Sequence, residues 1–337
     1  MKAIQKGFAA ILLLSSVVPV LAQDDAAARG GRDGTTEYWW VDKSPGGPNV
    51  YKAPNRPIWR LSELKQMHAG QNNWSQQIIL DDEENVTYNS GAPGAKIARR
   101  MHPDTPTVFV IIAGDLHFNV EGQQPVTATK SGIIHVMKDT PYSAEVTGDQ
   151  NALWIEVNLR GYSTVYPAAD PKPQNTPANS IAKVSFAHRP QPYNPPNQLY
   201  FNTLEAIATC KVHVAVEDDH LFANPALGYV NPADNKCGGG SLNTGSGRPI
   251  KPGATFNTSV PFGHLHSGAV EWWVIQVGQT SARFENYGEY HATEGDVMYV
   301  PPNTWHETTA DTPSGPSVRL AMGSYQRISM QNTGPAQ

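Results

Sequence analysis

The sequence is poor in charge and almost free of cysteine. Charged residues make up 16% of its 337 residues, and 25 basic against 30 acidic side chains give a formal net charge of −5. It has no cluster of Lys and Arg of the kind that binds nucleic acid, so no nucleic-acid partner is expected. No apolar run after the first residues is long enough to cross a bilayer, which predicts no membrane association of the mature chain.

The two cysteines, Cys210 and Cys237, both lie far from the N-terminus. In an oxidising compartment the simplest interpretation is one disulfide that closes a polar loop. Two free thiols or a thiolate metal site are the alternatives. The sequence lacks the CxxC spacing typical of the thiolate site.

The first 22 residues have the order of a secretory signal peptide. Two lysines precede an apolar run from Phe8 to Val20, and small residues end at Ala22. This run is too short for a membrane span, so we expect cleavage after Ala22 and a secreted or periplasmic protein. An uncleaved anchor is the alternative.

The length of the chain and its Gly- and Pro-rich segments predict two domains. After the signal peptide (1–22), a Gly- and Pro-rich N-terminal arm occupies 23–60, a first domain 61–165, a Pro-rich linker 166–200 and a second domain 201–330. Helical spacing of apolar residues predicts one short helix from Leu61 to Met67.

Most of the remaining pattern predicts strands. Short apolar or alternating runs are separated by Gly, Pro, Asn and Asp, which is typical of an antiparallel sandwich or barrel. The runs are Ile78–Leu80, Val108–Ala113, Ile133–Met137, Leu153–Val157, Lys211–Val216, Glu271–Val277, Ala282–Glu285, Val297–Val300 and Val318–Met322. The Gly-rich loop 238–253 lacks the residue order of a phosphate-binding loop, so no nucleotide is expected.

The two β-rich regions repeat one unit. The run from Val110 to Gly114 corresponds to the run from Val274 to Gly278, and Gly132 corresponds to Gly295 at the start of a later strand. Internal repetition of this kind predicts two copies of one fold.

A metal-ligand constellation lies in the second copy. On a strand, His264 and His266 point to one face, and a turn at Gly268 lets Glu271 return beside them. A strand that ends in a Pro-Pro-Asn turn presents His306. Three imidazoles and one carboxylate suit Mn, Fe, Ni, Cu, Co or Zn better than Ca or Mg.

These segments, HLHSGAVE with a later Gly278 and GDVMYVPPNTWH, resemble the paired motifs of the cupin superfamily. The resemblance implies an all-β chain of two cupin barrels, of the double-stranded β-helix or jelly-roll type, which is a bicupin. It also implies one divalent metal held by His264, His266, Glu271 and His306, with Mn or Fe favoured. Asn303 stands where the family often has Gly, and Asn tolerates the same left-handed turn.

The first copy departs from the family pattern. Arg100 stands at the place of the first His, Thr107 at that of Glu, and Tyr142 or Ser143 at that of the last His, while His102 remains. Since a guanidinium cannot coordinate a metal, no metal is expected there.

Several residues near the ligands are candidates for a substrate pocket. Alternation puts Trp273 on the face of Glu271, and Trp305 precedes His306; core packing is the alternative for both. Arg283 and Arg319 could clamp an anionic substrate if they face inward, and Tyr299 could donate a proton or be buried for packing.

The metal motif favours an enzyme with a small-molecule substrate, because ligands of this type leave open coordination positions. We expect an oxidoreductase of the dioxygenase type acting on a small organic or aromatic substrate. A decarboxylase or lyase similar to oxalate decarboxylases is the first alternative. A non-catalytic binding cupin is the second, and a homo-oligomer is compatible with each.

Overall fold

The computed structural model describes residues 50–170, 185, 190, 192–193, 198–208, 226–230, 264–266, 268–310, 317–323 and 329–331. The signal peptide, Cys210, Cys237, the predicted strand 211–216 and the Gly-rich loop lie outside these residues. Among the helices of the described part, none is long and apolar enough to cross a membrane.

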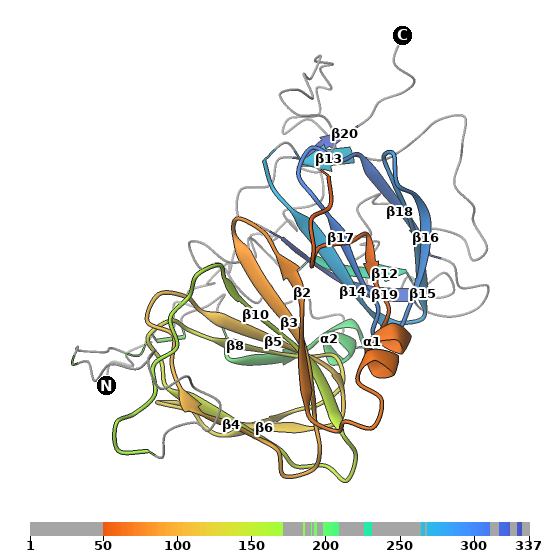
Figure 1. Ribbon diagram of the computed structural model, residues 1–337. Helices are drawn as coiled ribbons and strands as arrows, with labels where there is room; N and C mark the ends of the chain where they lie inside the picture. The colour runs from red at the N-terminus through yellow and green to blue at the C-terminus, as the bar shows by residue number, and fades with distance from the viewer. Residues whose placement is uncertain are drawn as a thin grey trace, which may run out of the picture.

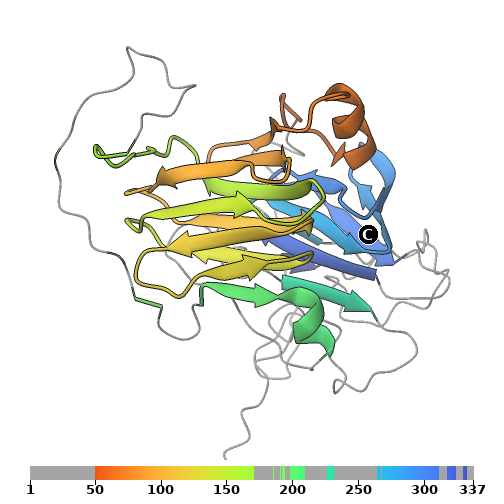
Figure 2. The same cartoon turned by 90° about the horizontal axis from the view of Figure 1, so that it is seen from below.

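The first β unit consists of two facing antiparallel sheets (Figures 1 and 2). Apolar residues from both sheets fill the space between them, among them Phe109, Phe118 and Ile134. The six-stranded sheet has the order β11-β8-β5-β10-β3-β2 and the other β4-β9-β6-β7. The strands are β2 (Trp74–Leu80), β3 (Glu84–Gly91), β4 (Lys96–Arg100), β5 (Thr107–Ala113), β6 (Leu116–Val120), β7 (Val126–Ala128), β8 (Gly132–Val136), β9 (Tyr142–Val146), β10 (Ala152–Leu159) and β11 (Tyr200–Asn202).

The second unit has the same plan, with its own core around Trp273, Ile275 and Phe284. Its sheets have the orders β1-β17-β14-β19-β12 and β16-β15-β18-β13-β20. The strands are β1 (Ile58–Trp59), β12 (Ala226–Val230), β13 (His264–His266), β14 (Glu271–Val277), β15 (Gln279–Phe284), β16 (Gly288–Thr293), β17 (Val297–Val300), β18 (His306–Ala310), β19 (Ser317–Gly323) and β20 (Ser329–Gln331). The two helices are α1 (Leu61–Met67) and α2 (Thr203–Ala208).

The predicted all-β class is confirmed, and the repeat is visible in the pairing. β5 lies between β8 and β10 as β14 lies between β17 and β19. Gly114 and Gly278 follow the two central strands with φ of 70° and 73°, a conformation that favours glycine. The described strands form two separate sheets in each unit, so a jelly-roll sandwich describes each unit better than a closed barrel.

The units exchange edge strands across the predicted domain boundaries. β1, from the predicted N-terminal arm, pairs with β17 of the second unit. β11, which spans the boundary between the predicted linker and the predicted second domain, pairs with β8 of the first unit. Each exchange protects a sheet edge that would otherwise be open.

The six-stranded sheet of the first unit and the sheet β1-β17-β14-β19-β12 of the second pack against each other through a shared apolar core that includes Ile155, Trp272 and Tyr299. Side-chain hydrogen bonds also cross it. Nε1 of Trp272 donates to Oε2 of Glu84 at 2.7 Å, and the hydroxyl of Tyr299 donates to Oδ2 of Asp81 at 3.2 Å. The face of β14 opposite this core points into the second sandwich.

Candidate metal centre

The predicted metal ligands lie on three strands of the second unit. The backbone of His264 in β13 pairs with His306 in β18, while Glu271 begins β14. The amide of Asn303 donates to the carbonyl of His266 at 2.7 Å, which ties the Pro-Pro-Asn turn to β13. Asn303 has φ of 58°, the left-handed conformation expected at this place.

Three of the predicted ligands converge inside the sandwich. His266, Glu271 and His306 each offer one ligand atom, and these atoms all lie within 4.8 Å of one another. Nε2 of His266 is 2.8 Å and Nε2 of His306 is 3.1 Å from Oε2 of Glu271. All three residues are buried, with exposed fractions of 4%, 7% and 1% in chain order.

Neighbouring groups orient these donors. Nδ1 of His306 lies 3.0 Å from the carbonyl of Thr304, so it carries the proton and leaves the Nε2 lone pair facing Glu271. Burial lowers the pKa of His306, which favours this neutral form. Nε1 of Trp273 donates to Oε1 of Glu271 at 3.0 Å. A neutral imidazole and a fixed carboxylate whose donor atoms converge on one position can bind a divalent cation there.

His264 is described only in its backbone. Its place beside His306 is compatible with a fourth ligand, and that role stays a prediction.

Two of the pocket candidates lie inside the second unit. Trp273 is buried, and the edge of its ring approaches His306 with 5.5 Å between centroids. The guanidinium of Arg319 is buried 4.7 Å from the centre of the Trp273 ring. The indole of Trp273 therefore lies beside the carboxylate of Glu271, and the positive charge of Arg319 lies against that indole.

The other three candidates lie elsewhere. Tyr299 lies in the core between the units, which agrees with burial for packing and not with a role as proton donor in the pocket. Arg283 pairs with Glu307 at 2.7 Å and lies over the ring of Trp305 at 5.4 Å. Because Ala282 and Phe284 belong to the inner core, alternation turns Arg283 to the outer face, so the condition for a clamp at Arg283 is not met.

The equivalent place in the first unit holds a polar network. Nε of Arg100 donates to the hydroxyl of Tyr142 at 2.9 Å, and Nη2 of Arg100 lies 2.6 Å from Oε1 of Glu156. Tyr142, not Ser143, therefore takes the place of the last His. Glu156 was missed in the sequence, although a Glu within the apolar run Leu153–Val157 was a signal of a buried charge that needs a partner.

His102 completes this network. Its Nδ1 lies 3.0 Å from the carbonyl of Ser163 and its Nε2 lies 3.0 Å from the hydroxyl of Tyr142. Burial and then the charge of Arg100 lower the pKa of His102, and burial raises the pKa of Tyr142. The neutral imidazole therefore donates to Ser163 and accepts from Tyr142, which leaves neither ring nitrogen for a metal.

Comparison with known proteins gives a structural but no sequence match. Neither a protein-family model nor a curated protein matches this sequence. Salicylate 1,2-dioxygenase from Pseudaminobacter salicylatoxidans is similar with a TM-score of 0.50 and 10% identity, over 82% of this chain and 88% of that one. Oxalate decarboxylase from Lactobacillus farciminis has a TM-score of 0.48 and 12% identity, over 85% and 90% of the chains. A mutant of Bacillus subtilis oxalate decarboxylase has a TM-score of 0.47 and 12% identity, over 89% of this chain and 88% of that one.

The fold and the site define a protein of two jelly-roll units, with a cluster of metal-ligand residues in the second. The chain shares its fold with this salicylate 1,2-dioxygenase, in agreement with the bicupin fold that the sequence resemblance implies. At 10% identity the similarity to the dioxygenase concerns the fold alone.

Proposed function

We propose that this chain is an exported, metal-dependent bicupin enzyme. Most simply it is an oxidoreductase of the dioxygenase type that acts on a small organic or aromatic substrate in the second unit. The observation that carries the proposal is the convergence of His266, Glu271 and His306 within 4.8 Å.

The donor set fits a divalent transition metal. Two imidazoles and a carboxylate bind Mn or Fe well, and four protein ligands, with His264 included, would leave two positions of an octahedral ion open. Such an ion supplies Lewis-acid or redox chemistry at those positions. The carboxylate is held by Trp273 and the imidazole by Thr304, so the protein presents its donors in a fixed orientation.

The residues around the cluster favour an anionic or aromatic substrate. Arg319 supplies a buried positive charge on the inner face of β19, and Trp273 supplies an apolar wall on the inner face of β14. A carboxylate at the guanidinium would be held by charge-assisted hydrogen bonds.

The test is metal analysis of the purified protein followed by a screen for oxygen uptake. Small carboxylic acids are the first substrates, with salicylate and oxalate included, and Glu271→Ala serves as the metal-free comparison. Oxygen uptake that depends on Glu271 supports the proposal. Carbon dioxide release without oxygen uptake would identify the decarboxylase alternative, and a tightly retained small molecule without turnover would identify the binding protein.

A further inference from the structure

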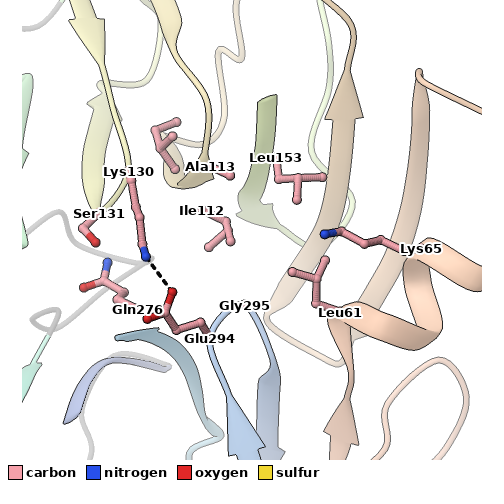
Figure 3. Close-up of a pocket in the computed structure, with 11 residues that line it drawn as sticks. Leu61, Lys65, Ile112, Ala113, Lys130, Ser131, Leu153, Gln276, Glu294 and Gly295 are labelled. Atoms are coloured by element: carbon pink, nitrogen blue, oxygen red, sulfur yellow. Dashed lines mark hydrogen bonds and ion pairs between the residues drawn. The ribbon is translucent and has the colours of Figure 1, made fainter. Parts of the chain in front are cut away.

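A cavity lies at the junction of the two units, and none of the predicted metal ligands lines it. Its volume is about 230 Å³, below the range of about 300–1,000 Å³ of sites for drug-sized ligands. Helix α1 borders it on one side, and Ser131 and Gln276 lie on the other (Figure 3). We call it the junction cavity.

Buried polar atoms without partners line this cavity. Both the oxygen and the nitrogen of the Gln276 carboxamide lack a hydrogen bond, as does the Ser131 hydroxyl. Gln276 is 3% and Ser131 is 1% exposed. Leaving such groups unpaired destabilises a protein, so their presence calls for an occupant that can pair with them.

The backbone at both positions is irregular. Ser131 has φ of 64°, a left-handed conformation that costs free energy for any residue except glycine. Gln276 sits where the pairing of β14 with β19 shifts register between Ile275 and Val277. A β-bulge of this kind re-aims a side chain, and strained residues often mark ligand sites.

Charge and apolar surface define the other end of the cavity. Lys65 of α1 is exposed and makes no ion pair with any described residue, and in Figure 3 its ammonium points toward the cavity. At the opposite end, beside Ser131 and Gln276, Lys130 and Glu294 pair at 2.6 Å across the junction (Figure 3). Ile112, Leu153 and Leu61 supply apolar walls between the two ends.

We propose that the junction cavity binds a short organic acid that carries a hydroxyl at the end opposite its carboxylate. The carboxylate lies at Lys65 and the apolar chain runs over Ile112 and Leu153. The hydroxyl donates to Oε1 of Gln276 and accepts from the hydroxyl of Ser131. This site is independent of the metal chemistry proposed for the second unit.

The test uses 5-hydroxypentanoate as the probe and isothermal titration of the metal-loaded full chain. Pentanoate, which lacks the hydroxyl, should bind about tenfold more weakly, because the buried carboxamide then stays unpaired. Gln276→Leu should weaken binding of the probe by about the same factor and leave the metal content unchanged.

Lysine variants test the other end. Lys65→Gln should weaken binding, whereas Lys96→Gln, which removes an exposed lysine of β4, should leave it unchanged. Ser131→Ala serves as a second hydroxyl-end variant if Gln276→Leu does not fold cooperatively.

Equal binding of the probe by the parent protein and by a folded hydroxyl-end variant would overturn the proposal, since it would place the ligand elsewhere, for example at the metal. The absence of binding at millimolar concentration would also overturn it. Because the variants keep the metal ligands, failure of this site and failure of the proposed enzyme activity are separately visible.

Discussion

In the first unit Nε of Arg100 donates to the hydroxyl of Tyr142 at 2.9 Å, at the places where the second unit has His264 and His306. The fixed cation of Arg100 is neutralised by Glu156, which also accepts from Nδ2 of Asn158 at 3.2 Å. The first unit therefore has the fixed positive charge of Arg100 at this place, whereas the second unit has side chains that can bind a cation. This difference separates the roles of two units with one fold.

Replacing Arg100 by Leu should destabilise the protein. The carboxylate of Glu156 would stay in a site where its side chain is 10% exposed, with the amide of Asn158 as its remaining donor. We expect a loss of about 2–3 kcal/mol, below the usual value for a fully buried pair because Arg100 is partly exposed. Urea unfolding measures it.

The double variant Arg100→Leu with Glu156→Gln is the control, since it removes both charges. It should be more stable than the single Arg100 variant. If the single variant loses no more than about 0.5 kcal/mol, the ion pair behaves as a surface pair and the account of this network is wrong.

Asp296 caps helix α1 from the other unit. Its Oδ1 accepts from the amide of Leu61 at 2.9 Å, and the residue before the helix, Arg60, supplies no side-chain cap. Its Oδ2 accepts from the amide of Thr293 at 2.9 Å. Asp296→Ala should therefore cost about 1–2 kcal/mol of unfolding free energy.

Asp296→Asn keeps one acceptor and should cost less than Asp296→Ala. Thermal unfolding of both variants, with the exposed Asp82→Ala as the matched control, checks the ranking. Identical losses in the Asn and Ala variants would contradict a capping role.

His135 should make the protein sensitive to acid. It is buried on β8 and neither ring nitrogen has a hydrogen bond, and burial lowers its pKa from 6.5 to about 3. Below pH 6.5 His135 binds a proton in the unfolded chain but stays neutral in the folded chain. The free energy of unfolding therefore falls as the pH falls toward 3. The loss between pH 7 and pH 5 is about 2 kcal/mol from this group.

His135→Leu should remove the part of the stability loss between pH 7 and pH 5 that comes from His135. The comparison is the unfolding free energy of the variant and the parent at pH 7 and pH 5, with Val136→Ala as a variant on the same strand that lacks a titrating group. An unchanged loss in His135→Leu would show that other groups dominate the acid response.

Local pattern predicted much of the fold. Helix α1 spans Leu61–Met67 and strands β14 and β17 span Glu271–Val277 and Val297–Val300, as apolar spacing indicates. Alternation also put Trp273 beside Glu271, because a strand fixes the direction of each side chain.

What the sequence could not provide is long-range pairing. β1 has two residues and no periodicity, and its partner β17 lies more than 230 positions away, so only the tertiary structure selects the pair. The same limit applies to Arg283, whose direction depends on the register of β15, and to Glu156, whose partner Arg100 lies on another sheet.

We propose that the second unit alone binds a metal, and the metal content per chain tests this most directly. Plasma mass spectrometry of the protein should find about one transition-metal ion per chain, lost in Glu271→Ala and in the His264→Ala, His266→Ala double variant, and kept in His102→Ala. Full metal retention in the Glu271 and double His variants, or its loss in the His102 variant, would contradict the account.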